Sequence, residues 1–443
     1  MKRLLGFLSL SLWTAISSAS PTLDLWQAWS FAQTSDPHYA AQQAQAQASQ
    51  EQIIQARAQL LPALDAVTSV QHADTRRASH LDQSQSNHLN QWQIRLSQPL
   101  LNLAALAQFE RSKYLAASAL FEQENAKNDL MLRLSTAYFD VLAAEDTLTS
   151  LQAQHRAVAH QLRAAQHAFE LGGATITDTY EAQSRLDLLN AQLITAQQTL
   201  TARRNHLSRI TGQPITDLAP LRANVSLPAP EPLYQDAWVT QANLNNLEVA
   251  QHNLAVQAQQ YQLKASQREH APTVSLQARS GSQSNMGVYG MNNGPRALDS
   301  NIGIELAIPL YKGGAISSQV RENASVLQQR MYDQENARRA ATEAAQTHFN
   351  GVTAGLLQVQ ALEAAERSSL QSVQANETAY EIGVRINIDV LNAQQQLYET
   401  QRALAHARYS TLLHGLRLKN AAGQLQENDV ALLNQLLETP SSL

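Results

Sequence analysis

The sequence predicts a mainly α-helical protein with a small membrane β part, built from two tandem structural repeats. Three observations predict this class: long tracts rich in Ala, Gln, Leu and Ser, landmarks that recur about 210 residues apart, and four short segments of alternating apolar and polar residues. The chain has 443 residues, a formal net charge of -5 and no cysteine. Aromatic residues make up only 5% of it, so the long tracts suit seams between helices better than a thick globular core.

The first residues have the pattern of a secretory signal peptide, predicted at residues 1–19. Lys2 and Arg3 precede an apolar run from Leu4 to Ile16, and small residues follow up to Ala19. A membrane anchor is the alternative, but the run is shorter than the ~20 apolar residues that span a bilayer. Removal of Lys2 and Arg3 makes the chain more acidic, which argues against nucleic acid as a partner.

Paired landmarks define the two repeats. Prolines recur at an offset of 210, and glycines and aspartates at 211, in the pairs Pro62/Pro272, Pro99/Pro309, Gly172/Gly383, Asp178/Asp389 and Gly212/Gly423. One position of slippage in more than 200 indicates two structurally equivalent halves. We expect a first repeat at 20–218, a proline-rich link at 219–232, a second repeat at 233–425 and a C-terminal segment at 426–443.

Each repeat has the same predicted order: a helix, two strands between prolines, a very long helix, a glycine turn and a return helix. In the first repeat the segments are 23–59, 63–73, 89–99, 103–171 and a return helix ending near 212. In the second they are 233–268, 272–281, 300–309, 314–382 and a return helix ending near 423. Leucines three and four positions apart in the return helices are typical of coiled-coil seams. A helix over 103–171 is roughly 100 Å long at 1.5 Å per residue, so we expect an elongated helical bundle or tube.

The four predicted strands alternate, as in "NIGIELAI" at 301–308. Arg95, Arg279 and Glu305 fall on the polar side of this alternation. A soluble sheet with one wet face is one explanation. Export, strand lengths of about ten residues and the lack of another apolar layer favour a β-barrel in a membrane. Four strands cannot close a barrel, so several copies of the chain must contribute to it.

These features together resemble the TolC family of outer-membrane channel proteins, from about Leu23 to near the C-terminus. The motifs that carry the resemblance are the two Pro-strand-strand-Pro units, "PLYKGG" at 309–314, "ITDTYEAQ" at 176–183 and "YEIGVRINIDVLNAQQQLY" at 380–398. The resemblance implies a homotrimer whose twelve-stranded β-barrel sits among outer-membrane lipid of a Gram-negative bacterium and continues into a periplasmic α-helical barrel. It also implies a passive exit duct, recruited by a periplasmic adaptor and an inner-membrane transporter for drug efflux or type I secretion.

By the same resemblance, the two glycine turns form the periplasmic entrance of the duct. The positions that match the family are the gate residues Thr177, Asp178, Tyr380 and Arg385, the selectivity-ring positions Asp389 and Asn392, the turn glycines Gly172 and Gly383, and the barrel-helix junction prolines Pro62, Pro99, Pro272 and Pro309. Asn392 stands where relatives carry a second carboxylate, so a weaker cation trap is expected. From local chemistry alone, the glycines suit helix C-termini, and Asp178 and Asp389 resemble caps that restart a helix. Capping and gating are compatible.

An enzyme finds little support in the sequence, and no catalytic residue, cofactor or metal site is expected. The 13 histidines are scattered, and His155, His160 and His167 lack the spacing of a zinc motif. Two other classes remain as alternatives. A periplasmic adaptor would have a single hairpin and a lipoyl-like β domain, and a structural coiled coil would leave the paired strands without a role.

Overall fold

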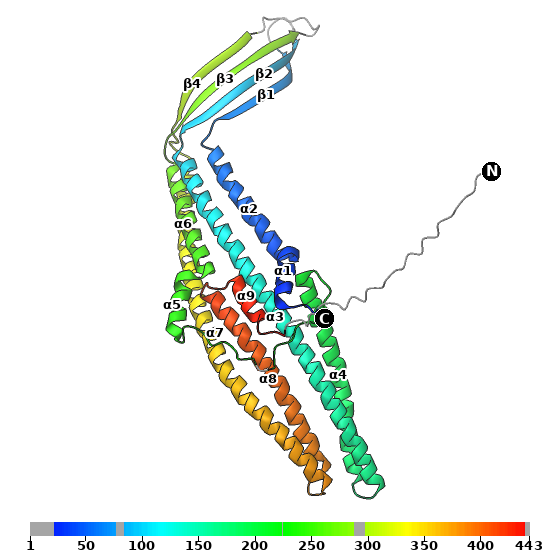
Figure 1. Cartoon of the computed structure of the whole chain (residues 1–443). Helices are drawn as coiled ribbons and strands as arrows, with labels where there is room; N and C mark the ends of the chain where they lie inside the picture. The colour runs from blue at the N-terminus through cyan, green and yellow to red at the C-terminus, as the bar shows by residue number, and fades with distance from the viewer. Residues whose placement is uncertain (1–21, 77–83, 224, 288–296, 439–443) are drawn as a thin grey trace, which may run out of the picture.

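A computed structural model describes residues 22–76, 84–223, 225–287 and 297–438. The predicted signal peptide and the last residues of the C-terminal segment, 439–443, lie outside the described residues. The molecule is elongated, with a β-sheet at one end and two helical hairpin tips at the other (Figure 1). It is a mainly α fold with a small β part, as the sequence predicts.

The first repeat contains four helices and two strands among the described residues. They are α1 (Leu25–Ser35), α2 (Pro37–Ala58), β1 (Ala63–Arg76), β2 (Ser84–Leu101), α3 (Leu103–Glu170) and α4 (Ile176–Thr211). The second repeat follows the same order with α5 (Gln235–Asn245), α6 (Leu247–Arg268), β3 (Thr273–Gly287), β4 (Ala297–Ala307), α7 (Ala315–Glu381) and α8 (Asn387–Ala421), and α9 (Glu427–Asn434) comes last.

The helix predicted at the start of each repeat is in fact two helices. In the first repeat the break falls at Asp36 and Pro37, because proline has no N–H to continue a helix and Asp36 accepts a hydrogen bond from the backbone N–H of Tyr39 at 2.8 Å. In the second repeat Asn246 caps α6 by accepting from the backbone N–H groups of Glu248 and Val249. The prediction of one continuous helix was therefore wrong in both repeats.

The sheet is antiparallel with the order β1-β2-β3-β4, so β1 and β4 are its edges. The register aligns Asp65, Arg95, Arg279 and Asn301 across the four strands on one face. The opposite face carries exposed apolar side chains, which include Leu64, Ile94, Ile302, Ile304 and Leu306. The sheet thus has one polar and one apolar face, and its strands are longer than the predicted ten residues.

The four landmark prolines lie where strands and helices meet. Pro62 and Pro272 immediately precede β1 and β3, and Pro309 lies between β4 and α7. Pro99 differs, because it lies inside β2, next to a shift in the register between β2 and β3. The strand predicted to reach residue 309 ends at Ala307.

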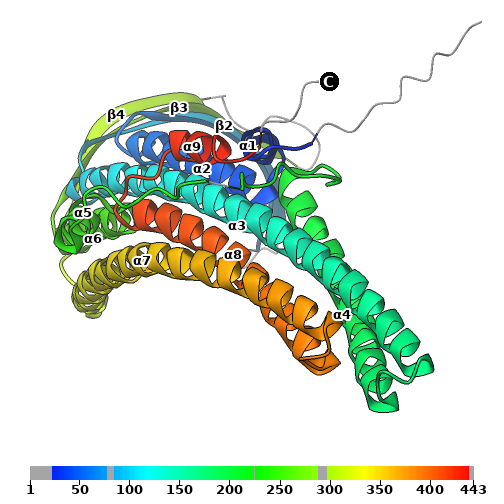
Figure 2. The ribbon, with the colours of Figure 1, turned by 60° about the horizontal axis from the view of Figure 1, so that its bottom comes forward.

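The helices α2, α3, α4, α6, α7 and α8 form one curved layer in which neighbours lie side by side (Figure 2). Near the sheet the order across the layer is α2, α3, α6, α7, and towards the tips it is α4, α3, α8, α7. One side of the protomer is therefore formed by β1, α2 and α4, and the other by β4 and α7. Within the described part of the chain, none of the helices is both long and apolar enough to cross a membrane.

The main hydrophobic core lies at the middle of the long helices, where α1, α9 and the segment 215–221 pack against α3, α4 and α8. We call this level the equator. Trp29, Tyr138 and Phe139 are almost fully buried there. The Tyr138 hydroxyl donates to the carbonyl oxygens of Leu23 and Ala219 at 3.1 and 3.0 Å, which holds the first residues against the link between the repeats. The core fixes the long helices at their centre and leaves their far ends to extend as two hairpins.

Candidate functional site at the hairpin tips

The two tips turn in the same way, at Gly172 and at Gly383. Both glycines have positive φ, 77° and 76°, a conformation that side chains with a Cβ rarely adopt. The next residue in each tip donates its backbone N–H to a carbonyl of the preceding helix, Gly173 to Ala168 at 2.8 Å and Val384 to Ala379 at 2.9 Å. These bonds satisfy carbonyls that a helix end leaves unpaired. The glycines end α3 and α7 without strain.

The helices restart differently after the two turns. Thr175 is the N-cap of α4, and the Asp178 carboxylate accepts from both the backbone N–H and the hydroxyl of Thr175 at 2.9 Å. Ile386 precedes α8 and has no side-chain cap bond. Asp178 is thus part of a capping box but is not the N-cap, and Asp389 lies in the first turn of α8. The N-cap positions are Thr175 and Ile386, three residues before Asp178 and Asp389, so the aspartates themselves are not the N-cap residues.

The predicted gate residues lie close together on the tips but do not form the expected tie within one protomer. The Arg385 guanidinium, in the turn before α8, donates to Asp389 in the first turn of α8 at 3.4 Å, and Arg385 is exposed while Asp389 is half-buried. Burial and the charge of Asp178, from the other hairpin, raise the pKa of the Tyr380 phenol. Thr177 is exposed at the start of α4.

Asn392, at the second position of the predicted selectivity ring, binds across the two hairpins. Its side-chain oxygen accepts from Arg185 of α4 at 2.9 Å. The same guanidinium donates to Gln395, one turn further along α8. Asn392, predicted to stand at a position where relatives carry a carboxylate, therefore has a structural contact that joins α4 to α8.

Two buried amides, Asn387 and Gln161, were not predicted from the sequence. The Gln161 side chain donates to the Asn387 side-chain oxygen at 2.6 Å, and the Asn387 side-chain nitrogen donates to the carbonyl oxygen of Asp178 at 3.1 Å. Asn387 is 1% exposed and Gln161 6%. Asn387 lies within the tip motif, but Gln161 lies in a long tract of similar polar residues, so no local pattern distinguishes it.

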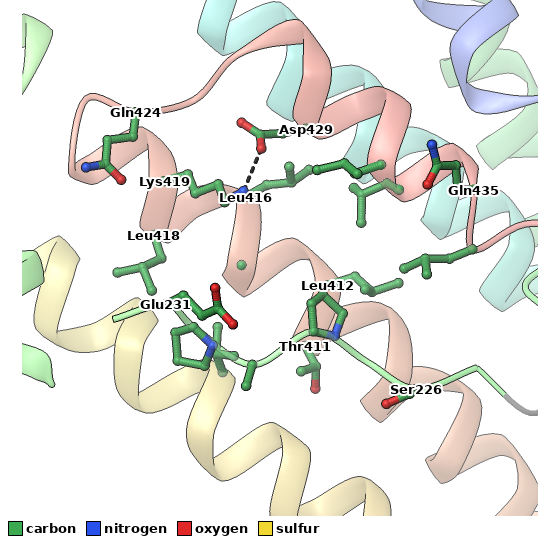
Figure 3. A pocket seen from close by; sticks show the side chains of 18 of the residues that line it. Ser226, Glu231, Thr411, Leu412, Leu416, Leu418, Lys419, Gln424, Asp429 and Gln435 are labelled. Carbon is green, nitrogen blue, oxygen red and sulfur yellow. Dashed lines mark hydrogen bonds and ion pairs between the residues drawn. The ribbon is translucent and has the colours of Figure 1, made fainter. Parts of the chain in front are cut away.

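A separate cavity of about 630 Å³ lies at the equator, between α8, α9 and the link residues 226–231 (Figure 3). Trp238, Leu412 and Leu416 contribute to its largely apolar wall. Lys419 and Asp429 also line it and form an ion pair at 2.5 Å. The cavity is distant in the fold from the predicted gate residues, and its wall joins parts of the chain that no sequence motif connects.

Comparison with known proteins places these features in a family. The family model described as outer membrane efflux protein matches residues 11–213 and 238–424. The outer membrane protein TolC of Escherichia coli is 29% identical, over 100% of this chain and 90% of that protein. The alkaline protease secretion protein AprF of Pseudomonas aeruginosa is 28% identical, over 98% of this chain and 91% of that protein.

Solved structures show the same fold. The Campylobacter jejuni CmeC outer membrane channel has a TM-score of 0.80 at 16% identity, and the match covers 99% of this chain and 98% of that one. The outer membrane protein VceC of Vibrio cholerae has a TM-score of 0.77 at 18% identity, over 90% of this chain and 96% of that one.

The long helical layer, the terminal sheet and these relatives define an exit duct of the outer membrane. The chain belongs to the outer membrane efflux protein family. It is located in the outer membrane of a Gram-negative bacterium and extends into the periplasm, as the sequence predicts.

Proposed function

We propose that three copies of the chain assemble into one continuous duct, open from the periplasm to the cell surface. The observation that carries this proposal is that, among the residues that the structure describes, the protomer has two sides without a neighbouring strand or layer helix, β1 with α2 and α4 on one and β4 with α7 on the other. Because the two sides differ, copies join head to tail, and a rotation that closes gives a ring. Three copies supply twelve strands, more than the eight of the smallest bacterial barrels.

The two faces of the sheet fit such a barrel. The apolar face, with Leu64, Ile302 and Ile304, contacts lipid, and the polar face, with Arg95 and Arg279, lines the lumen. The long helices then continue the lumen across the periplasm. Each copy contributes both repeats, 20–218 and 233–425, so the duct has six similar units around its axis.

The duct works as the passive outer component of an export machine. A periplasmic adaptor and an inner-membrane transporter engage it and supply the cargo and the energy, and the chain itself catalyses no reaction and needs no cofactor. Relatives named for protease secretion and relatives named for efflux support both drug efflux and type I secretion as routes.

The hairpin tips form a gate at the periplasmic entrance. Asp178, Thr177, Tyr380 and Arg385 hold neighbouring tips together, and three copies of Asp389 ring the constriction. The proximity of Tyr380 to the Asp178 carboxylate and the position of all these residues at the tips support the assignment. A partly buried charged contact is strong enough to bias a two-state gate.

The proposal is tested by extracting the processed protein with detergent, measuring its mass and recording single channels in planar bilayers. We expect a trimer. Its conductance should rise in Arg385→Glu, because the new carboxylate repels that of Asp389, and it should also rise in Asp178→Lys. The paired variant Arg338→Gln/Arg339→Gln, which removes exposed charges from the middle of α7, serves as the control. A water-soluble monomer would refute the duct, and unchanged conductance in both tip variants would refute the gate.

A further inference from the structure

We propose that the Asn387 side chain is a latch that holds the two hairpin tips of one protomer together and limits how far the entrance opens. This inference rests on the proposed gate and adds a residue pair that the gate motif does not contain. Asn387 begins α8, Gln161 lies in α3 and Asp178 in α4, so one side chain joins both hairpins.

The chemistry of the three groups fixes the direction of both hydrogen bonds. The Asp178 carbonyl oxygen can only accept, so the Asn387 nitrogen must face it. The Asn387 oxygen then faces Gln161 and needs a donor, which the Gln161 amide nitrogen supplies at 2.6 Å. A primary amide provides one donor and one acceptor on its two sides, so asparagine meets both requirements at this position.

Because they are buried, the two Asn387 hydrogen bonds hold the tips together more strongly than the nearby Arg385–Asp389 ion pair does. Ala182 and Leu391 are fully or almost fully buried in the small apolar cluster between the same hairpins. Water is therefore excluded from the contact while the tips stay together. The Arg385–Asp389 pair, in contrast, joins the turn to the first turn of α8 within one hairpin, and its guanidinium is exposed to solvent, where an ion pair contributes little.

Separation of the hairpins breaks both Asn387 bonds at once, whereas it leaves the Arg385–Asp389 pair intact. Movement of α8 relative to α3 and α4 must therefore overcome the latch. Loss of the latch raises the fraction of open entrances, and we expect an increase of about tenfold, which is equivalent to 1.4 kcal/mol.

The test compares single-channel opening of Asn387→Leu, Gln161→Leu and the double variant with that of the native trimer. Asn387→Leu should open the entrance most, because it loses both bonds, and Gln161→Leu should open it less. The double variant should open no more than Asn387→Leu, because the two residues share one bond. Asn376→Leu is the control, since the Asn376 amide bonds back to Ser372 of its own helix at 2.8 Å and joins no second hairpin.

Gln161→Glu gives an independent test that keeps the size of the side chain. An ionised carboxylate cannot donate to the Asn387 side-chain oxygen. If the Asn387 amide rotated so that its nitrogen faced the carboxylate, its oxygen would face the Asp178 carbonyl oxygen, and the hydrogen bond to Asp178 would be lost instead. The entrance should therefore open more as the pH rises through the titration of the new carboxyl, and the Asn376→Leu control should show no such dependence.

The outcomes separate the latch from the gate. If Arg385→Glu raises conductance but Asn387→Leu, Gln161→Leu and Gln161→Glu all conduct like the native trimer, the latch is wrong and the gate stands. If none of these variants changes conductance, the gate itself is wrong. If Asn387→Leu fails to assemble, the Gln161→Glu variant tests the latch instead. Its conductance at low pH, where the new carboxyl is protonated and can donate, is the reference for its conductance at high pH.

Discussion

Arg385, in the turn before α8, and Asp389, in the first turn of α8, bind each other with 3.4 Å between guanidinium and carboxylate. The residue expected to tie neighbouring helices thus neutralises part of the charge of the predicted selectivity ring. Because the Arg385 side chain is exposed, the pair competes with solvent and with any partner on an adjoining tip. Charge at the entrance therefore depends on both residues.

Removing either member of this pair should change ion selectivity in opposite directions. Asp389→Ala removes a carboxylate from each copy and should lower the preference for cations. Arg385→Gln leaves Asp389 without its counter-charge and should raise it. Reversal potentials in a salt gradient measure both effects, and a shift of the same sign in the two variants would contradict the ring.

Charged substitutions on the two faces of β4 should differ strongly in their effect on trimer assembly. Ile304→Arg places a charge on the apolar face and should cost about 2–4 kcal/mol near the bilayer centre. Gly303→Arg, on the polar face of the same strand and opposite Gln277, should be tolerated, because a Cβ at this position meets no atom within 4 Å. The yield of heat-resistant trimers in detergent compares the two variants, and equal loss in both would contradict the assigned faces.

Alanine substitutions at two glycines of the equatorial helices should change the stability of the protein in opposite directions. Gly415 lines the equatorial cavity, and a Cβ at this position would meet no atom within 4 Å. Gly415→Ala should therefore stabilise the protein by about 0.5–1 kcal/mol, because alanine favours a helix interior. Gly355→Ala is the matched contrast, since its Cβ would collide with the Thr411 side chain. Chemical unfolding should show a higher midpoint for the first variant and a lower midpoint for the second.

A histidine pair between α7 and α8 predicts loss of stability in mild acid. His348 and His414 have their Nδ1 atoms 3.1 Å apart, and burial, His414 and Arg417 lower the pKa of His348 to about 4. The folded protein therefore resists protonation that the unfolded chain accepts near pH 6.5. This contribution to the free energy of unfolding is fully present above pH 6.5 and is lost as the pH falls towards 4. It is on the order of 1 kcal/mol, because the site is partly exposed.

The check is the pH dependence of unfolding in the native protein and in His348→Gln. The variant should lose less stability than the native protein between pH 7 and pH 4.5. Parallel curves for the two proteins would show that the pair does not titrate in this range.

Much of the architecture was predictable because it depends on local patterns repeated over long segments. Helix seams, alternating strands and the glycine turns each carry their signal within a few residues, and duplication shows each signal twice. The breaks at Asp36 and Asn246 were missed because polar tracts continue through them, and a single capping side chain decides where a helix stops.

The site was less predictable, because its contacts join distant positions. The sequence placed Arg385 and Asp389 together at one tip, but it predicted Asp178 and not Asp389 as the partner of Arg385. Gln161 and Asn387 are 226 positions apart, and their contact depends on how two hairpins lie against each other. The Asn392 contact with Arg185 has the same origin, so the substitution of a ring carboxylate was visible in the sequence but its structural contact was not.

The unpaired edges of the sheet have a consequence for biogenesis. A newly exported copy presents the backbone groups of β1 and β4, together with an exposed apolar face, to the aqueous periplasm. Such edges pair readily with any extended chain. If the proposed trimer forms, a single subunit is consequently prone to aggregation until it pairs with two other copies or is bound by a chaperone.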